Sequence, residues 1–244
     1  MSNQTLESRP AVLVTGGTKR IGAAITRRLA AAGWRVLAHT RDAASEEARA
    51  LAASCGAEPV QADLAVPGGA AALFAAAVAA APELAFIVNS AAAFAPGPLP
   101  PGESARMAAL NTDAPEKLTS LLGLRLLENP PGLPRRGAVV DLLDAAVRGA
   151  ADAQTSPYAA SKAALAASMR KSAGLFADSL RVNAVAPGAV LPPPCGGVPG
   201  GDTLLPERPS PDDVAYAVEF LLKAGGVTGQ TILVDSGRFI LDAL

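Results

Sequence analysis

The sequence has 244 residues, half of them hydrophobic, and its 21 basic and 22 acidic side chains leave a formal net charge of −1. A chain so close to neutral offers no basic face for nucleic acid or for an anionic membrane, so neither is expected as a partner. Segment 1–10 is too polar for a signal peptide, no apolar run reaches the ~20 residues that cross a bilayer, and Cys55 and Cys195 match no metal spacing, so we expect a cytoplasmic protein without a metal site.

A buried strand is predicted at 11–14, and a glycine turn leads from it into a helix that ends near Gly33. Strand, glycine turn and helix in this order are typical of a dinucleotide fold. Only a missing side chain lets backbone N–H groups and the positive end of a helix approach a pyrophosphate closely. We therefore predict cofactor contacts from the turn, namely from Gly16, Thr18, Lys19, Arg20 and Ile21.

The second strand is predicted at 35–40, followed by a helix over 43–54 and a third strand at 59–62. An acidic residue at the end of the second strand holds a ribose 2′-hydroxyl, whereas a basic residue there accommodates a 2′-phosphate. This chain has His39-Thr40-Arg41, and Asp42 comes only after them. We therefore predict NADPH, with Thr40, Arg41 and Lys19 around its phosphate. His39, the only histidine, is explained equally well as a surface residue or as a cofactor contact.

Asp63 and Leu64 follow the third strand, where adenine contacts usually lie. A helix is then predicted at 68–80 and a buried fourth strand at 84–88, and a loop rich in Pro and Gly leads to a helix over 103–127 interrupted near Pro115. Asn111 lies inside this last helix. Asparagine is mildly unfavourable in a helix interior, so Asn111 is either solvated or held there for a purpose.

The second half continues the alternation, with a strand at 137–143, a helix within 154–176, a strand at 179–186, a helix over 211–223 and a strand at 231–234. The irregular segment 187–209 is typical of a lid or a substrate-binding loop. The whole pattern predicts one α/β domain over residues 1–244. Its architecture is expected to be a Rossmann-like, doubly wound parallel sheet of about seven strands with helices on both faces.

Tyr158 and Lys162 are four residues apart, so in a helix both side chains lie on one face. A phenol ionises near pH 10, and a neighbouring ammonium favours the phenolate and lowers that pKa. Tyr158 could then exchange a proton with a substrate. The alternative is a chance spacing on an ordinary amphipathic helix.

Taken together, these motifs resemble the short-chain dehydrogenase/reductase family over nearly the whole chain. The matching features are Thr15-Gly16 with Gly22, Asp63, Asn89-Ser90-Ala91, Asn111, Tyr158 with Lys162, Pro187-Gly188, Val227-Thr228-Gly229 and Val234-Asp235. The resemblance implies a homotetramer in which Tyr158 is the proton donor, Lys162 holds the nicotinamide ribose and Asn111 shapes a water path. It also implies cofactor contacts from Asn89, Ala91, Pro187 and Gly188.

Three departures are similar to pteridine reductases and dihydromonapterin reductases. Arg20 stands where the family usually has a glycine, Asp144 replaces the usual serine after the fifth strand, and Phe94 lies in a segment whose phenylalanine stacks on a pterin. The resemblance implies that the chain reduces a C=N bond of a dihydropterin with NADPH. Asp144 would relay the proton and Arg20 would contact the polar edge of the pterin. Ala92 and Ala93, by contrast, replace small polar residues of some relatives.

Each of these interpretations has an alternative. Phe94 could be a core residue, Arg20 a solvated helix residue, and Asp144 a cap or surface acid, with Asp141 or Ser156 beside the phenol instead. The whole protein could be a short-chain carbonyl or 3-oxoacyl reductase, or a non-catalytic nucleotide-binding regulator. The small-molecule substrate that segment 187–209 selects among pterins and folates is not decided by the sequence.

Overall fold

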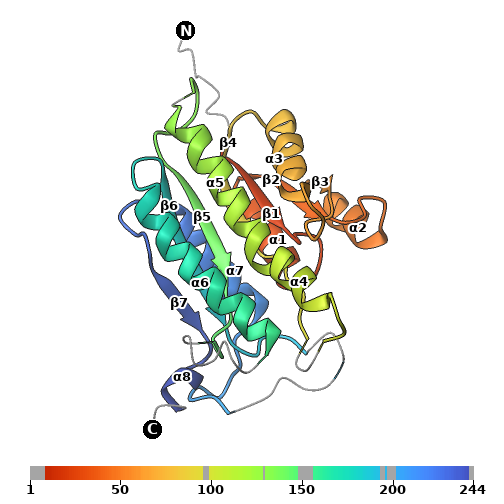
Figure 1. The fold of residues 1–244 in the computed structure, drawn as a ribbon, viewed down its shortest axis with the longest axis vertical. Coiled ribbons are helices and arrows are strands. Elements are labelled where there is room, and N and C mark those ends of the chain that lie inside the picture. Colours follow the sequence, from red (N-terminus) through yellow and green to blue (C-terminus); the bar gives the residue numbers. More distant parts are fainter. Residues whose placement is uncertain are drawn as a thin grey trace.

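The computed structural model describes residues 9–95, 99–128, 130–147, 156–192, 196 and 202–241. Its centre is a sheet of seven parallel strands in the order β3-β2-β1-β4-β5-β6-β7 (Figure 1). The strands are β1 (Ala11–Thr15), β2 (Arg35–Thr40), β3 (Glu58–Gln61), β4 (Leu84–Asn89), β5 (Gly137–Leu142), β6 (Leu180–Pro187) and β7 (Thr231–Val234). The predicted doubly wound sheet is confirmed.

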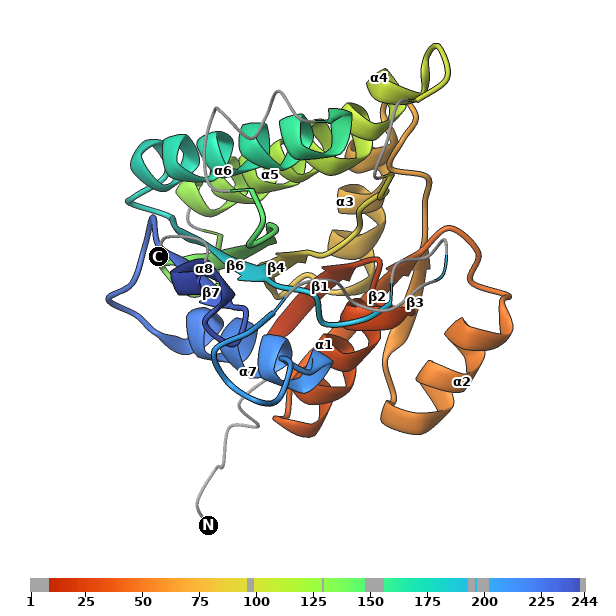
Figure 2. The ribbon, with the colours of Figure 1, turned by 90° about the horizontal axis from the view of Figure 1, so that it is seen from below.

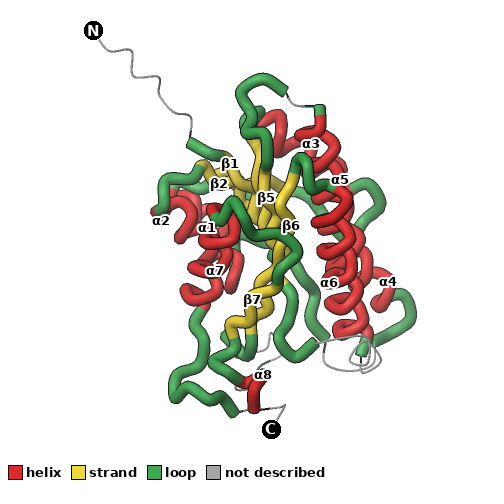
Figure 3. The backbone as a smooth tube through the Cα atoms, turned by 90° about the vertical axis from the view of Figure 1, so that its left-hand side faces the viewer, coloured by secondary structure: helices red, strands yellow, loops and turns green. Residues whose placement is uncertain are grey.

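Helices cover both faces of this sheet, as Figures 2 and 3 show from two directions. One layer contains α1 (Arg20–Ala31), α2 (Glu46–Cys55) and α7 (Pro211–Lys223). The other contains α3 (Gly69–Ala80), α4 (Glu103–Ala108), α5 (Ala114–Leu127) and α6 (Pro157–Leu175). A short helix, α8 (Arg238–Leu241), follows the last strand and was not predicted from the sequence. No helix within the described ranges is long and apolar enough to cross a bilayer.

The alternation of side chains along each strand gives the molecule two hydrophobic cores. In β1, Leu13 packs in the core beneath α3, α5 and α6, whereas Val12 and Val14 pack in the core beneath α1 and α7. Successive side chains of a strand point to opposite faces, so a strand covered on both sides is apolar throughout. This is why the strands read as uninterrupted apolar runs in the sequence.

The predicted long helix over 103–127 is divided into three parts. Between α4 and α5 lies a π-helical turn, η1 (Ala109–Asp113), which contains Asn111. Single π-turns inside helices are rare and frequently occur at functional sites. The interruption was expected near Pro115, and η1 ends two residues before this proline, which occupies the first turn of α5.

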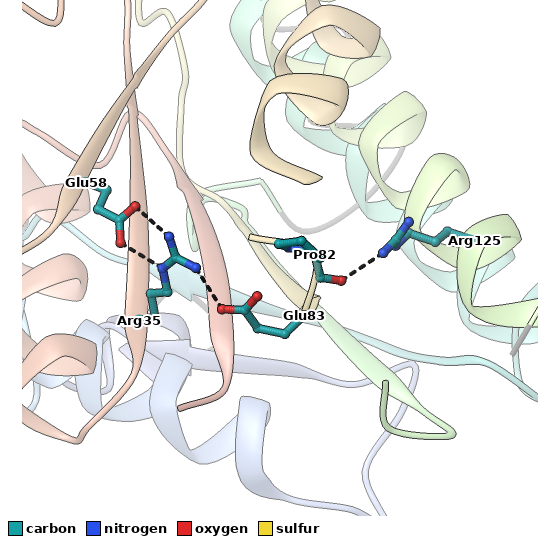
Figure 4. A network of polar contacts seen from close by, with 5 residues as sticks. All are labelled: Arg35, Glu58, Pro82, Glu83 and Arg125. Atoms are coloured by element: carbon teal, nitrogen blue, oxygen red, sulfur yellow. Dashed lines mark hydrogen bonds and ion pairs between the residues drawn. The ribbon is translucent and has the colours of Figure 1, made fainter. Parts of the chain in front are cut away.

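A polar network joins the beginnings of three strands (Figure 4). Arg35, the first residue of β2, makes two hydrogen bonds to Glu58 at 2.7 and 2.9 Å and one to Glu83 at 2.9 Å. Nearby, Arg125 of α5 donates to the Pro82 carbonyl at 2.8 Å. The network lies at the amino edge of the parallel sheet, so it holds the strands together at the end opposite their carboxyl termini.

Candidate active site

The carboxyl ends of the strands open into a cavity of about 1200 Å³. Loops that follow β1 to β6 contribute to its wall, together with α6 and α8. It collects sixteen of the residues that the sequence assigned to cofactor or substrate: Gly16, Thr18, Lys19, Arg20, Ile21, Thr40, Arg41, Asp63, Leu64, Ala91, Phe94, Asp144, Tyr158, Lys162, Pro187 and Gly188. In open parallel sheets, ligands bind at this edge.

The glycine turn after β1 is packed closely enough to require its glycines. Gly16 has φ +61°, and a Cβ on Gly22 would lie only 2.2 Å from the Gly16 carbonyl oxygen. The Thr26 hydroxyl donates to the Gly17 carbonyl at 3.0 Å from the first turns of α1. A tight glycine turn that lines a cavity at the start of a helix has the form that suits a pyrophosphate.

Arg20 adopts φ +51° at the position where the family usually has glycine. A left-handed conformation costs a residue with a Cβ roughly 1–2 kcal/mol. Its guanidinium donates to the Pro192 carbonyl at 2.6 Å, so the side chain reaches the segment that follows β6. Arg20 therefore connects the glycine turn with the loop expected to contact substrate. Much of that loop, residues 193–195 and 197–201 with Cys195, lies outside the described residues.

Tyr158 and Asp144 are in direct contact. The Tyr158 hydroxyl donates to Asp144 Oδ2 at 2.8 Å, and Asp144 Oδ1 accepts from the Ala146 amide at 2.8 Å, which fixes the carboxylate. The Phe94 ring meets the Tyr158 ring edge-on, with centroids 4.8 Å apart and planes at 76°. Phe94 is 41% exposed at the cavity, so it is not a core residue.

The alternative neighbours of the phenol have other partners. The Ser156 hydroxyl caps α6 by accepting from the Ala159 amide at 3.1 Å. Asp141 is buried in β5 and accepts a hydrogen bond from Asn89 Nδ2 at 2.8 Å. Asp144 is therefore the carboxylate that the fold brings to Tyr158.

The prediction that Lys162 lowers the pKa of the Tyr158 phenol is wrong. The pKa of Tyr158 is raised, not lowered, first by burial and then by the charge and hydrogen bond of Asp144. Lys162 Nζ instead donates to the Leu142 carbonyl at 2.7 Å. Burial lowers the pKa of Lys162 to about 8 against the attraction of Asp144 and Asp141. The four-residue spacing suggested that Lys162 would lower the pKa of Tyr158, but burial of the phenol is the larger effect and raises it.

Asn111 and Asn89 were predicted at the site but support its wall from behind. Asn111 is fully buried in η1; its Oδ1 accepts from the Ala93 amide at 2.8 Å, and its Nδ2 donates to the Ala93 carbonyl at 2.9 Å and to the Ser161 hydroxyl at 3.0 Å. Asn89 is 2% exposed and bonded to Asp141. Asn111 thus joins the loop after β4 to α6, and Asn89 joins β4 to β5.

Some cavity residues were not predicted from the sequence. Arg238 and Phe239 of α8 line the cavity, because the chain after β7 turns back over the end of the sheet. His39, treated as a surface residue or a cofactor contact, is 3% exposed and lies between the glycine turn and the end of β3. Its position at the end of an apolar strand was the one signal for burial. No cluster of metal-binding side chains occurs in the described part of the chain.

Known proteins share this arrangement over most of their length. A family model described as enoyl-(acyl carrier protein) reductase matches residues 16–238. A protein of Streptomyces violaceoruber, named as ketoacyl reductase 2 of the granaticin polyketide synthase, is 32% identical over 251 aligned positions, covering 95% of this chain and 97% of that protein.

Solved structures also resemble this chain over nearly its whole length. The FolM alternative dihydrofolate reductase 1 of Brucella canis, in complex with NADP, has a TM-score of 0.81 and 28% identity, with 96% of both chains covered. A blue fluorescent protein from a metagenomic library, in complex with NADPH, has a TM-score of 0.80 and 27% identity, with 96% of this chain and 99% of that chain covered. With its motifs, its fold and a family match over most of its length, the chain belongs to the short-chain dehydrogenase/reductase family.

Proposed function

We propose that this protein is an NADPH-dependent reductase of a C=N bond in a dihydropterin. The observation that carries the proposal is the 2.8 Å hydrogen bond between the Tyr158 hydroxyl and the Asp144 carboxylate, with the exposed Phe94 ring against the same phenol. A phenol and a carboxylate in contact supply a path for a proton, and a partly exposed ring supplies a surface for a flat substrate.

NADPH is the dinucleotide that the cavity favours. The tight glycine turn suits its pyrophosphate, and Thr40 and Arg41 lie on the cavity at the end of β2, where Arg41 and Lys19 would hold a 2′-phosphate. Lys19 forms an exposed ion pair with Glu47 at 3.1 Å, which an incoming phosphate could replace. Lys162 would hold the nicotinamide ribose. When bound, NADPH supplies the hydride. The NADP complexes of two structural relatives support this choice.

The chain itself must supply the proton. Reduction of C=N adds a hydride to carbon and a proton to nitrogen. Because burial and Asp144 raise its pKa, the Tyr158 phenol stays protonated at neutral pH and so has a proton to give. The resulting phenolate would take its proton back from solvent: the Asp144 carboxylate, which lines the cavity, would pick up a proton and pass it along the hydrogen bond to Tyr158. A serine in that position could donate a hydrogen bond but could not carry the proton as a carboxylate does.

The substrate would lie beside Phe94 with Arg20 at one edge. A stacked aromatic contact contributes about 0.5–1.5 kcal/mol beyond burial and fixes the plane of the ring. The planar guanidinium of Arg20 matches the adjacent donors and acceptors on a pterin edge. The name of the Brucella canis relative, an alternative dihydrofolate reductase, agrees with a reduced pterin as the substrate class.

A ketoacyl reductase is the second candidate. It is favoured by the family model and by the name of the Streptomyces violaceoruber relative. Asp144 speaks against it, because an alkoxide that develops from a carbonyl is stabilised by a hydroxyl donor and opposed by a carboxylate.

The deciding experiment follows the loss of NADPH absorbance with dihydrobiopterin, dihydrofolate and an acetoacetyl thioester. We expect turnover with at least one pterin and a kcat/KM at least about ten-fold lower with the thioester, a difference of about 1.4 kcal/mol in the barrier. A thioester preference would establish the ketoacyl reductase instead. Turnover of no compound would favour the nucleotide-binding regulator.

We also infer that residues 1–244 act as one NADP-binding domain within a homotetramer. Three leucines on the outer surfaces of α5 and α6 are at least half exposed: Leu124, Leu127 and Leu175. Exposed apolar side chains gathered on neighbouring helices favour association of copies. Light scattering coupled to size-exclusion chromatography would give the mass of the assembly, and a monomer would refute this inference.

A further inference from the structure

His39 is the only histidine of the chain and lies buried at the carboxyl end of β2. Its Nδ1 accepts a hydrogen bond from the Gly16 amide at 3.0 Å, and its Nε2 lies 3.2 Å from the Ala62 carbonyl oxygen, just beyond β3. The backbone carbonyl of His39 accepts from the Gly17 amide at 3.0 Å. One residue therefore holds two successive amides of the glycine turn.

These contacts permit only one protonation state of the ring. The Gly16 amide can only donate, so Nδ1 must carry no proton, and the Ala62 carbonyl can only accept, so Nε2 must carry one. The neutral Nε2–H tautomer satisfies both groups. An imidazolium would place an Nδ1 proton against the Gly16 amide proton, and the bond to the turn would be lost.

The surroundings of the ring favour the neutral form. Burial lowers the pKa of His39, and the positive charge of Arg41 lowers it further, while the Ala62 carbonyl and the Asp63 carboxylate act in the opposite direction. Of these causes, burial is the largest. The ring is therefore neutral at pH 7 and acquires its proton only in more acidic solution.

We propose that His39 is a positioning residue for the dinucleotide: its neutral ring holds the Gly16 amide in place, so that protonation loosens the glycine turn and weakens NADP(H) binding. The inference rests on NADP(H) as the cofactor and not on the pterin as the substrate. The turn has little room to adjust, because a Cβ on Gly16 would lie 3.0 Å from Ala91 Cα. Loss of the His39 acceptor leaves a partly buried amide without its partner and would displace the turn from the phosphate path.

Protonation also adds a positive charge near an anionic ligand, and this Coulomb attraction would strengthen binding. The two effects have opposite signs, so the direction of the pH dependence decides between them. The 2′-phosphate of the dinucleotide loses a charge near pH 6 as well. A reference protein whose residue 39 does not titrate is therefore required.

The first measurement is made on untagged wild-type protein labelled with ¹⁵N-histidine. Because the chain has a single histidine, long-range ¹H–¹⁵N correlation spectra report one ring. We expect the Nε2–H tautomer, a titration midpoint below the ordinary value near 6.5, and a still lower midpoint in the presence of saturating NADP⁺. An Nδ1–H tautomer, or a midpoint that NADP⁺ leaves unchanged or raises, would overturn the proposal.

The second measurement is the Kd of NADP⁺ by titration calorimetry between about pH 5 and 8 for wild type, His39→Asn and His39→Leu. The asparagine Oδ1 can replace Nδ1 as the acceptor of the Gly16 amide, whereas leucine offers no acceptor. At pH 8 we expect a Kd near the wild-type value for His39→Asn and about ten-fold higher for His39→Leu, equivalent to about 1.4 kcal/mol.

As the pH falls, the ratio of the wild-type Kd to the His39→Asn Kd should rise, because only wild type loses its acceptor. Thr26→Val is the matched control, since it removes the other side-chain bond to the turn, from the Thr26 hydroxyl to the Gly17 carbonyl, without changing a titratable group. Because this variant keeps His39, the ratio of its Kd to the wild-type Kd should not change with pH. Equal Kd values for His39→Asn and His39→Leu at pH 8 would refute the positioning role. So would a ratio of the wild-type Kd to the His39→Asn Kd that stays constant or falls as the pH is lowered.

Discussion

The hydroxyl of Tyr158 donates to Asp144 Oδ2 at 2.8 Å, although the two residues come from α6 and from the loop that follows β5. In this contact the negative charge of Asp144 and the burial of the phenol both raise the pKa of Tyr158. In the proposed reaction the pair would therefore act as a protonated donor with a carboxylate behind it, and not as a phenolate prepared by Lys162.

Replacement of Tyr158 by phenylalanine removes the proton donor while keeping the ring that packs against Phe94. We expect kcat to fall by at least about 100-fold, in the range of a lost general acid. The Kd of NADP⁺, measured by calorimetry, should stay within about two-fold of wild type, or about 0.4 kcal/mol, because the Tyr158 hydroxyl is bonded to Asp144 and not to the glycine turn. Retention of most turnover would remove Tyr158 from the proposed role.

Substitution of Asp144 by serine restores the hydroxyl usual in the family. If the carboxylate returns the proton, as proposed, and does not polarise a carbonyl, kcat/KM for dihydropterins should fall about 10- to 100-fold more than kcat/KM for a small ketone. Asp144→Asn is the control of similar size that can hydrogen-bond but cannot carry the proton. Parallel losses on both substrates would contradict the relay.

Arg41 lies on the cavity at the end of β2, where a 2′-phosphate would approach. Arg41→Asp should repel that phosphate and favour a free 2′-hydroxyl. We expect the ratio of kcat/KM for NADPH to that for NADH to fall by at least about ten-fold, or about 1.4 kcal/mol. Arg41→Ala should change the ratio in the same direction but less. An unchanged ratio would mean that the phosphate is bound elsewhere.

Arg20 combines a left-handed backbone with a side-chain bond to the Pro192 carbonyl. Arg20→Gly removes the side-chain bond and also the Cβ that is strained at this positive φ. Relief of that strain should raise the free energy of unfolding by about 1 kcal/mol. Arg20→Ala removes only the side chain and should show no such gain. Both variants should raise KM for dihydropterin. Urea denaturation checks stability, and a glycine variant less stable than the alanine variant would disprove the strain.

Asp141 is a buried carboxylate beside an amide with an unmet acceptor. Asn89 Nδ2 donates to Asp141, while Asn89 Oδ1 is buried and accepts no hydrogen bond from any residue in the described ranges. Asp141→Asn removes the buried charge and can donate to Asn89 Oδ1. Burial raises the pKa of Asp141 from 3.8 to about 6, so above pH 6 the carboxylate is ionised at a cost.

Two pKa units correspond to about 3 kcal/mol, and this net shift already includes the attraction to Lys162 and the hydrogen bond from Asn89. We expect Asp141→Asn to raise the free energy of unfolding by about 1–2 kcal/mol at pH 7. Below pH 3.8 the Asp141 carboxyl is protonated in both the folded and the unfolded protein, and its ionisation costs no stability. Wild type loses stability as the pH rises from there through about 6, so the stability gained by Asp141→Asn should shrink toward pH 4. Asp141→Leu should destabilise the protein, because it leaves both Asn89 groups without partners. Urea denaturation at several pH values checks all three proteins.

Much of the fold could be read from the chain, because apolar runs separated by helical segments specify a parallel sheet with two covered faces. All seven predicted strands begin and end within one residue of the observed ones, and the glycine turn after β1 is where the pattern predicted it. The interruption of the helix over 103–127 was expected near Pro115 and lies just before it, at 109–113. Its π-helical form was not predicted, and Asn111 within it is bonded to Ala93 and Ser161, which are distant in sequence.

The chain order by itself determined which residues meet at one edge of the sheet, because parallel strands bring their carboxyl ends together. It thereby placed Asp144, Tyr158 and Phe94 around one cavity. Only the tertiary structure decided the pKa shifts of the titratable groups Tyr158, Lys162 and His39. Burial and contacts between distant segments set the raised pKa of Tyr158, the lowered pKa of Lys162 and the neutral ring of His39, since desolvation depends on what surrounds a group in space and not on its neighbours along the chain.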